Sequence, residues 1–206
     1  EPVEGAYGPM EAPYTFINQS GGPYRTYRFE TFSLGEFKAL SRRLDCTIND
    51  LVLALCSEAL RRYIIEIEPL PATPLVAVMP VGNRGDDVHP KFLNTEILNN
   101  SVSIAFVPLD LQIESFVERL ESIKRGAKAA MEQTRRTKGT RIENIADFLP
   151  GSLFRVLNWI LARRQSRKLN PLASAAISNV PGPREALYAC DGRLKMVDLL
   201  SCGNLV

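Results

Sequence analysis

The most restrictive feature of this sequence is an unbroken apolar run, PLVAVMPV, at residues 74–81. A strand with one face in water alternates apolar and polar residues, whereas a strand covered on both faces does not. Long helical patterns lie on either side of the run, at about 47–65 and 112–135. Strands that alternate with long helices predict an α/β domain in which helices cover a mainly mixed sheet.

The helix predicted to follow Thr47 has the clearest start signal in the chain. Thr47 and Asp50 have the spacing of a capping box, in which each side chain bonds to the backbone of the other residue. Capping and the helix dipole therefore explain Asp50, whereas Asn49 offers its amide to whatever faces the helix N-terminus. The expected buried stripe comprises Ile48, Leu51, Val52, Leu55, Cys56, Ala59, Leu60 and Tyr63, and Leu53 and Ala54 widen it. The expected polar face comprises Ser57, Glu58, Arg61 and Arg62. With Leu55 in that stripe, Leu55→Ala should cost about 2–5 kcal/mol of stability.

The rest of the chain divides into an arm and one domain. Residues 1–22 are rich in Gly and Pro without a period, which is typical of a linker or an extended arm. We assign 23–206 to a single domain with a strand at 24–32 and a helix that Ser33 and Glu36 start as a capping box. The expected buried stripe of that helix comprises Leu34, Phe37, Leu40 and Leu44. The chain ends in an apolar stretch, so we expect the domain to be truncated at its C-terminus.

A stiff turn follows the strand predicted at 172–180. The sequence there is Ser178-Asn179-Val180-Pro181-Gly182-Pro183. Pro and Gly at the centre of a type II turn would fix the direction of the strand end, and Pro183 further restricts Gly182. Strand ends of open α/β sheets are where ligands bind. Two interpretations stay open at this point: a ligand site that uses Asn179, or a rigid corner in which Asn179 caps backbone groups.

Composition excludes several classes of function. The chain has 25 basic and 23 acidic residues, a net charge of +2, so we expect no nucleic-acid partner. The single histidine, His89, lies in a polar loop and is a poor candidate for a general base. Neither metal-ligand spacing nor the glycine-rich motifs of nucleotide sites occur, so we expect no metal and no bound cofactor.

One segment combines apolar, aromatic and basic residues. The sequence FLPGSLFRVLNWIL includes Phe148, Phe154 and Trp159, and Arg163, Arg164, Arg167 and Lys168 follow it. This composition is typical of a helix that lies on a lipid surface. An ordinary core helix with a solvated basic end is the alternative. A span of the membrane is excluded for this segment because it is too short and is interrupted by Pro150-Gly151.

Four stretches together resemble a known family. They are TINDLVLALCSEALRRYI, PLVAVMPVGNR, NNSVSIAFVPL and AISNVPGPREALY, which occur in this order along the chain. The chain resembles the C-terminal half of bacterial-type wax ester synthase/diacylglycerol acyltransferases. These enzymes belong to the coenzyme A-dependent acyltransferase superfamily, which also includes chloramphenicol acetyltransferase. The resemblance covers roughly residues 20–206 and implies one half of a two-domain fold, with residues 1–22 as the crossover between the halves.

The resemblance implies transfer of a fatty acyl group from acyl-coenzyme A to a long-chain alcohol or diacylglycerol, as in wax ester and triacylglycerol synthesis. The family's general base is a histidine of an H-H-x-x-x-D-G motif in the N-terminal half, and this sequence contains no such motif. We therefore expect this chain to be inactive alone and to need that half as its partner. Asn49 and Asp50 match the family's N-D motif as active-site support. Asn179 to Pro183 match its N-V-P-G-P turn, which implies that these residues and Ser178 before them line the substrate tunnel.

Two other functions stay open: a non-catalytic domain that binds lipid, coenzyme A or a protein partner, and a condensation-type domain that acts on carrier-protein thioesters. The N-D and N-V-P-G-P motifs favour the acyltransferase over the condensation domain. We expect a cytoplasmic protein. Whether it also binds peripherally to a membrane or a lipid droplet stays open at this point. Acyl-coenzyme A enters as a substrate and not as a cofactor.

Overall fold

The protein is described here by a computed structural model. It describes residues 3–19, 26, 28, 30–82, 102–137, 155–156, 159–160, 163, 167–179, 188–189, 194–195 and 201–203. The elements within these ranges are η1 (Phe16–Asn18), α1 (Leu34–Arg43), α2 (Ile48–Ile65), β1 (Val76–Gly82), β2 (Val102–Pro108), α3 (Phe116–Thr137), β3 (Ala175–Ser178), β4 (Tyr188–Ala189), β5 (Leu194–Lys195) and β6 (Ser201–Gly203).

The main sheet is mixed and has four strands in the order β2-β1-β3-β6. β1 pairs antiparallel with β2 and parallel with β3, which in turn pairs antiparallel with β6. β4 and β5 form a separate two-stranded pair. The unbroken apolar run forms β1, and residues on both of its faces are buried, Ala77 and Met79 on one face and Val76 and Val78 on the other. The prediction of a mixed sheet covered by helices is therefore confirmed.

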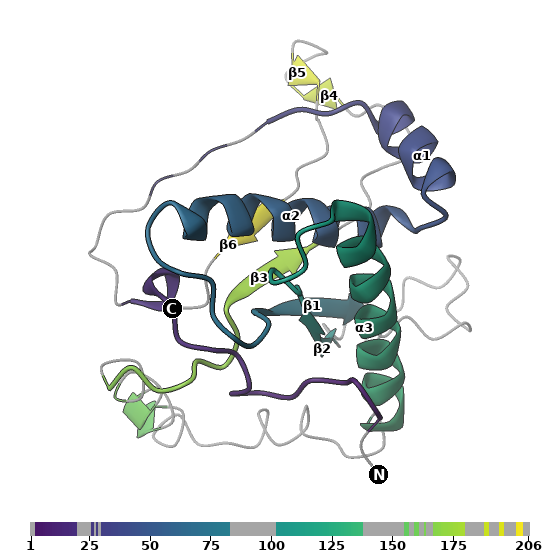
Figure 1. The fold of residues 1–206 in the computed structure, drawn as a ribbon. Coiled ribbons are helices and arrows are strands. Elements are labelled where there is room, and N and C mark those ends of the chain that lie inside the picture. The colour runs from purple at the N-terminus through teal and green to yellow at the C-terminus, as the bar shows by residue number, and fades with distance from the viewer. Residues whose placement is uncertain are drawn as a thin grey trace.

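The core lies between this sheet and a layer formed by α2 and α3, which lie in front of the sheet in Figure 1. α3 packs closely on the end of β2. A Cβ atom added at Gly126 of α3 would lie 2.6 Å from Cγ of Pro108. Glycine is therefore required for this helix to approach the strand so closely. The buried members of the core are Val52, Leu53, Ala54, Ile64, Leu75, Ala77, Met79, Ala105, Val107, Leu109, Leu111, Leu120, Ile123, Ala127, Ala130 and Ile177.

The N-terminal arm packs against the body of the domain at several points. The backbone N–H of Val3 donates to Gln133 Oε1 near the end of α3, at 2.9 Å. The N–H of Phe16 donates to Glu68 Oε1 at 3.2 Å, just beyond α2. Asn18 is buried, and its Nδ2 donates to the carbonyl of Ser174 at 3.3 Å. The arm thus joins the ends of α3 and α2 to the residues that lead into β3 (Figure 1).

The predicted buried face of α2 is correct in part. Leu51 and Val52 are buried, and Cys56 and Leu60 are partly buried against the core, whereas Tyr63 is 52% exposed. Leu53, Ala54, Ser57 and Ile64 are buried, whereas Leu55 is 38% exposed. Residues 51–54 are all apolar and therefore do not define a side of the helix. Further along, the choice of face depends on Ser57, whose hydroxyl donates to the carbonyl of Leu109 at 2.5 Å. A polar side chain with a partner can be buried, so the face that the sequence marks as polar turns inward.

α1 begins as predicted, because Ser33 Oγ accepts a hydrogen bond from the N–H of Glu36 at 3.4 Å. Its predicted buried stripe is correct at Phe37 and Leu44, which are partly buried against the core, and wrong at Leu34 and Leu40, which are 53% and 38% exposed. α1 stands apart from the layer of α2 and α3 in Figure 1, which explains this exposure. The strand predicted at 24–32 is not observed at residues 26, 28 and 30–32, the part of that range that the structure describes.

Within the described ranges, no helix is long and apolar enough to cross a membrane.

Candidate functional site near the carboxyl end of β3

The capping box at the start of α2 is present as predicted. Thr47 Oγ1 accepts a hydrogen bond from the N–H of Asp50 at 3.1 Å, and Asp50 Oδ2 accepts one from the N–H of Thr47 at 3.0 Å. The Thr47 hydroxyl also donates to Asp50 Oδ2 at 2.6 Å. Asp50 is buried, and these contacts fix its carboxylate at the helix start. Helix capping therefore accounts for the position of Asp50.

Asn49 has a different environment. Its side chain is half-buried, and Nδ2 donates to the thioether sulfur of Met79 in β1 at 3.1 Å. A thioether is a weak acceptor. Within the described part of the chain, Met79 is the partner observed for this amide. Asn49 is thus a polar group held over the sheet by a weak hydrogen bond, and a stronger acceptor can take the place of the Met79 sulfur.

The register of the sheet places Asn49 near the end of β3 as well. β1 and β3 run parallel with Val78 opposite Ala176, so Met79 lies beside Ile177. Both of these residues are buried in the core between the sheet and the helices. Asn49 therefore lies over Met79 in the middle of β1, beside the carboxyl end of the adjacent parallel strand β3. The carboxyl ends of parallel strands are where open α/β sheets bind ligands.

Ser178 and Asn179 lie at this same edge. Ser178 is the last residue of β3, is half-buried and pairs with Ser201 of β6. Because side chains alternate along a strand, Ser178 faces away from the helix layer that Ile177 contacts. Asn179 follows the strand and is exposed. The predicted tunnel residues Val180, Pro181, Gly182 and Pro183 lie outside the described residues, so their role stays a prediction.

A cysteine lies close to this edge, one residue before the capping box. Burial raises the pKa of the Cys46 thiol, and the nearby Asp50 carboxylate raises it further. A raised pKa keeps the sulfur protonated and weakens it as a nucleophile. The environment of Cys46 therefore argues against covalent catalysis by this residue.

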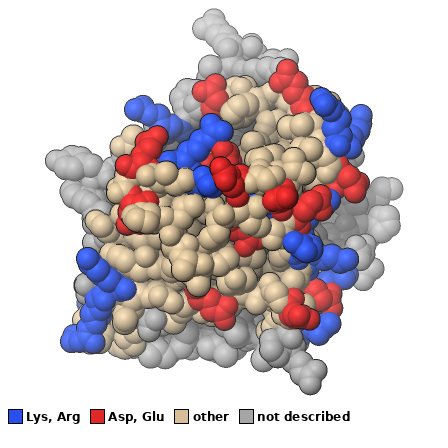
Figure 2. Space-filling model, in the orientation of Figure 1, with Lys and Arg blue, Asp and Glu red and all other residues tan. Residues whose placement is uncertain are grey.

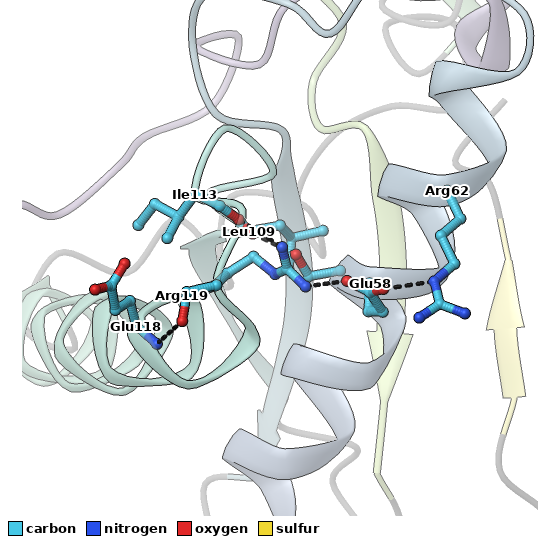
Figure 3. Close-up of polar contacts among 8 residues, drawn as sticks. Glu58, Arg62, Leu109, Ile113, Glu118 and Arg119 are labelled. Atoms are coloured by element: carbon cyan, nitrogen blue, oxygen red, sulfur yellow. Dashed lines mark hydrogen bonds and ion pairs between the residues drawn. The ribbon is translucent and has the colours of Figure 1, made fainter.

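The sequence prediction missed an ion pair between the two helices of the layer, formed by a buried arginine and a partly exposed glutamate. The side chain of Arg119 on α3 is fully buried and donates through Nη2 to Glu58 of α2 and through Nη1 to the carbonyl of Ile113, the latter at 2.6 Å (Figure 3). Glu58 also accepts from Arg62, which is largely exposed. Burial alone would raise the pKa of Glu58, but the hydrogen bonds from Arg62 and Arg119 outweigh it and hold the pKa below its ordinary value.

This ion pair is separate from the strand-end site. Glu58 lies nine residues beyond Asn49 on α2, about 13.5 Å along the axis at 1.5 Å per residue. Its position within the helix layer indicates a structural role. A signal was present in the sequence, since Arg119 is three residues after Phe116 and four before Ile123, within the apolar stripe of α3.

Comparisons with known proteins relate this chain to one family. The sequence model of the WS/DGAT C-terminal domain matches residues 98–204, which include β2, α3, β3 and the turn after β3. O-acyltransferase WSD of Acinetobacter baylyi is 31% identical over 87% of this chain and 36% of its own length. A putative diacylglycerol O-acyltransferase of Mycobacterium tuberculosis is 34% identical over 93% of this chain and 37% of its own length.

A solved structure, the wax ester synthase/diacylglycerol acyltransferase from Marinobacter aquaeolei VT8, is 29% identical to this chain. The match covers 76% of this chain and 31% of that protein, with a TM-score of 0.46. The chain thus spans well under half of the length of these relatives. The family match covers more than half of the chain itself, and the chain therefore belongs to the WS/DGAT C-terminal domain family.

Proposed function

We propose that this chain forms the C-terminal part of an O-acyltransferase that moves a fatty acyl group from acyl-coenzyme A to a long-chain alcohol or diacylglycerol. Family membership supports the reaction class, since the matched relatives are named as O-acyltransferases. The observation in the structure that supports it most is the position of Asn49 over Met79 of β1, beside the carboxyl end of β3. That edge is where a substrate is expected in a sheet of this kind.

The proposed reaction forms one bond and breaks one. The acceptor hydroxyl oxygen attacks the thioester carbonyl carbon while a general base takes its proton. The carbon–sulfur bond then breaks, the acyl group remains on the acceptor oxygen, and the coenzyme A sulfur leaves with a proton. Two adjacent histidines, as in the family's H-H-x-x-x-D-G motif, do not occur in these 206 residues, of which His89 is the single histidine. We therefore assign the base to the segment that this chain lacks relative to its relatives.

Asn49 is proposed to hold a substrate oxygen beside the reacting carbonyl. Its amide N–H groups are neutral donors, so they bind oxygen without transferring a proton. Exchanging the Met79 sulfur for an oxygen acceptor would give a stronger hydrogen bond than the present one. Ser178 to Pro183 are proposed as one wall of the substrate tunnel, while Asp50 supports the site by fixing the start of α2.

The proposed partner is the N-terminal half that carries the base. The chain covers 36–37% of the two relatives described above, which leaves most of their length to other segments. Residues 1–22 are proposed as the crossover that joins the halves, and the observed packing of residues 3–19 along the body would give that crossover a fixed path. Because acyl chains and diacylglycerol collect in lipid, we also propose peripheral contact with a lipid surface.

The test measures release of coenzyme A thiol from palmitoyl-coenzyme A with hexadecanol or diacylglycerol as acceptor. This chain is assayed alone, and joined to an N-terminal half with the H-H-x-x-x-D-G motif. Release only in the joined form, with formation of the matching ester, supports the proposal. If the joined protein is folded and releases no thiol with either acceptor, the acyltransferase proposal is wrong, and direct binding of lipid and coenzyme A then tests the binding-domain alternative.

A further inference from the structure

A short helix of the N-terminal arm, η1, touches both elements that hold the candidate site. Its first residue, Phe16, packs on α2, where the centre of its ring lies 5.3 Å from the ring centre of Tyr63 in an edge-to-face contact. Its last residue, Asn18, bonds to the segment that leads into β3. Asn49 lies on α2 and Ser178 lies on β3. η1 therefore connects the two elements whose relative position defines the site.

The contacts of Asn18 belong to a buried polar network. Asn18 and Thr15 are each 4% exposed, and Ser174 is fully buried. Asn18 Nδ2 donates to the carbonyls of Ala173 at 3.4 Å and Ser174 at 3.3 Å. Asn18 Oδ1 accepts a hydrogen bond from the Thr15 hydroxyl at 3.2 Å. Ser174 continues the network into the sheet, since its N–H donates to the carbonyl of Val76 at 2.7 Å and its Oγ accepts from the N–H of Val76 at 3.3 Å. The network thus joins the arm to the first residue of β1.

The ladder between β1 and β3 is too short to fix β3 along its length by itself. It has two residue pairs and ends at Val78 opposite Ala176. The N–H and the carbonyl of Val76 both face β3, and because this direction alternates along a strand, the backbone groups of Val78 and Pro80 face β3 as well. Proline has no N–H, so Pro80 cannot extend the ladder. The bonds of Asn18 and Ser174 therefore contribute directly to the lengthwise position of β3.

The bonds around Asn18 join uncharged groups. Figure 2 shows few charged side chains in the middle of the face that Figure 1 presents, between α2 and the arm. Hydrogen bonds between neutral groups depend closely on distance and angle, and they are not screened by salt as surface ion pairs are. The network is therefore suited to hold η1 and β3 at a fixed spacing.

We infer that Asn18 is a positioning residue for the candidate site. It holds the start of β3 against η1, which rests on α2, and so sets how far Ser178 and the turn after β3 lie from Asn49. A strand rises by about 3.3 Å per residue, whereas misplacement by about 1 Å can lower a rate roughly a hundredfold. A slide of β3 by a fraction of one residue would therefore disturb the site. The effect on acyl transfer rests on the proposed function, while the hold on β3 does not.

The first test compares Asn18→Ala with the wild type in the protein joined to its N-terminal half. It measures the ratio of kcat/KM for palmitoyl-coenzyme A to kcat/KM for octanoyl-coenzyme A. A displaced tunnel wall alters the fit of the acyl chain, so this ratio should change by at least about fivefold. A loss of folded enzyme lowers both values equally and leaves the ratio unchanged. The ratio therefore separates positioning from a general loss of stability.

Gln133→Ala is the matched control for this comparison. Gln133 also binds the arm through its side-chain amide, at the N–H of Val3, but it lies on α3 and has no bond to β3. Its substitution should leave the ratio unchanged. Ser174→Ala removes the acceptor of the Val76 N–H in the same network and should shift the ratio as Asn18→Ala does. If Asn18→Ala does not fold, Asn18→Ser replaces it, because serine keeps one donor and should give a smaller change in the same direction.

Amide hydrogen exchange gives a readout that needs no turnover. Local opening of a strand exposes its own amides without unfolding the rest of the domain. Exchange at residues 175–178 should therefore become faster in Asn18→Ala, whereas exchange in α3 should stay as in the wild type. Gln133→Ala should leave exchange in β3 unchanged. Faster exchange throughout the domain in Asn18→Ala would indicate general destabilisation and would overturn the inference.

The inference and the proposed function fail separately. If the wild-type joined protein releases no thiol, the proposed function is wrong, and the exchange measurement alone decides whether Asn18 holds β3. If the wild type is active, and Asn18→Ala keeps both its substrate ratio and its exchange in β3, Asn18 is not a positioning residue.

Discussion

The guanidinium of Arg119, fully buried on α3, donates to the carboxylate of Glu58 on α2 and joins the two helices that cover the sheet. The same guanidinium donates to the carbonyl of Ile113, so it also ties the connection between β2 and α3 to this layer. Within the part of the chain that the structure describes, Arg119 Nε has no hydrogen-bond partner. The Glu58 carboxylate is therefore the counter-charge on which burial of this arginine depends.

Removal of Glu58 should be strongly destabilising. Glu58→Ala leaves a buried guanidinium without its carboxylate, and breaking a buried pair in this way costs about 3–5 kcal/mol. Arg62→Ala removes the other partner of the same carboxylate, but Arg62 is largely exposed, so its loss should cost about 1 kcal/mol or less. Urea unfolding of both variants measures the difference, and equal losses would contradict a special role for Arg119.

The same carboxylate predicts a dependence of stability on pH. The folded-state pKa of Glu58 lies below its ordinary value. The contribution of Glu58 to the free energy of unfolding is therefore fully present at pH values above the ordinary pKa of a glutamate, about 4. This contribution is lost as the pH falls through the lowered pKa of the folded state. The difference in unfolding free energy between the wild type and Glu58→Gln should shrink on acidification from neutral pH. A difference that stays constant or grows would show that the pair has the opposite linkage.

Gly126 tests the close packing of α3 on β2. In Gly126→Ala the new Cβ would lie 2.6 Å from Cγ and 2.9 Å from Cδ of the Pro108 ring. Overpacking of this kind costs about 1–3 kcal/mol, which exceeds the gain of about 1 kcal/mol that alanine brings to a helix. Gly35→Ala in α1 is the control, because its nearest neighbour is Ser33 Oγ at 3.5 Å. Thermal melting should show a loss at 126 and no loss at 35.

A pair of leucines two residues apart on α2 tests which face is buried. Leu53 is fully buried and Leu55 is 38% exposed. Leu53→Ala should cost about 2–5 kcal/mol, as expected for a core leucine, whereas Leu55→Ala should cost about 1 kcal/mol or less. Urea unfolding measures both losses of stability. A larger loss for Leu55→Ala than for Leu53→Ala would contradict the observed orientation of α2 and support burial of Leu55, as predicted from the sequence.

The sequence predicted features that depend on neighbouring residues. The Thr47–Asp50 capping box involves residues three apart, and the double-sided burial of β1 follows from a single apolar run. The pairing of β1 with β2 and β3 agrees with the mixed sheet expected from strands that alternate with helices.

Features that depend on distant partners were not predicted. Ser57 is buried because it donates to the carbonyl of Leu109, and Arg119 is buried because Glu58 lies on another helix. Neither partner can be identified from the local pattern, so the sequence prediction placed Ser57 on the polar face of α2 and Leu55 in its buried stripe. For the candidate site, the sequence indicated Asn49 and the end of β3 separately. The parallel pairing of β1 with β3 brings them to one edge.

The central claim is that Asn49 serves acyl transfer at this edge, and the most direct test is the turnover of Asn49→Ala in the protein joined to its N-terminal half. Asn49 is half-buried and donates to a weak acceptor, so the melting temperature should stay near that of the wild type. Loss of a hydrogen bond of about 1.4 kcal/mol lowers a rate tenfold, so thiol release from palmitoyl-coenzyme A should fall at least about tenfold.

Met79→Leu is the matched control for this measurement, because it removes the sulfur acceptor of Asn49 at nearly constant volume and should leave turnover close to normal. The account predicts a large loss of turnover in Asn49→Ala with an unchanged melting temperature. Normal turnover, or a fall that is matched by a collapse of the melting temperature, would contradict it and make Asn49 a structural residue.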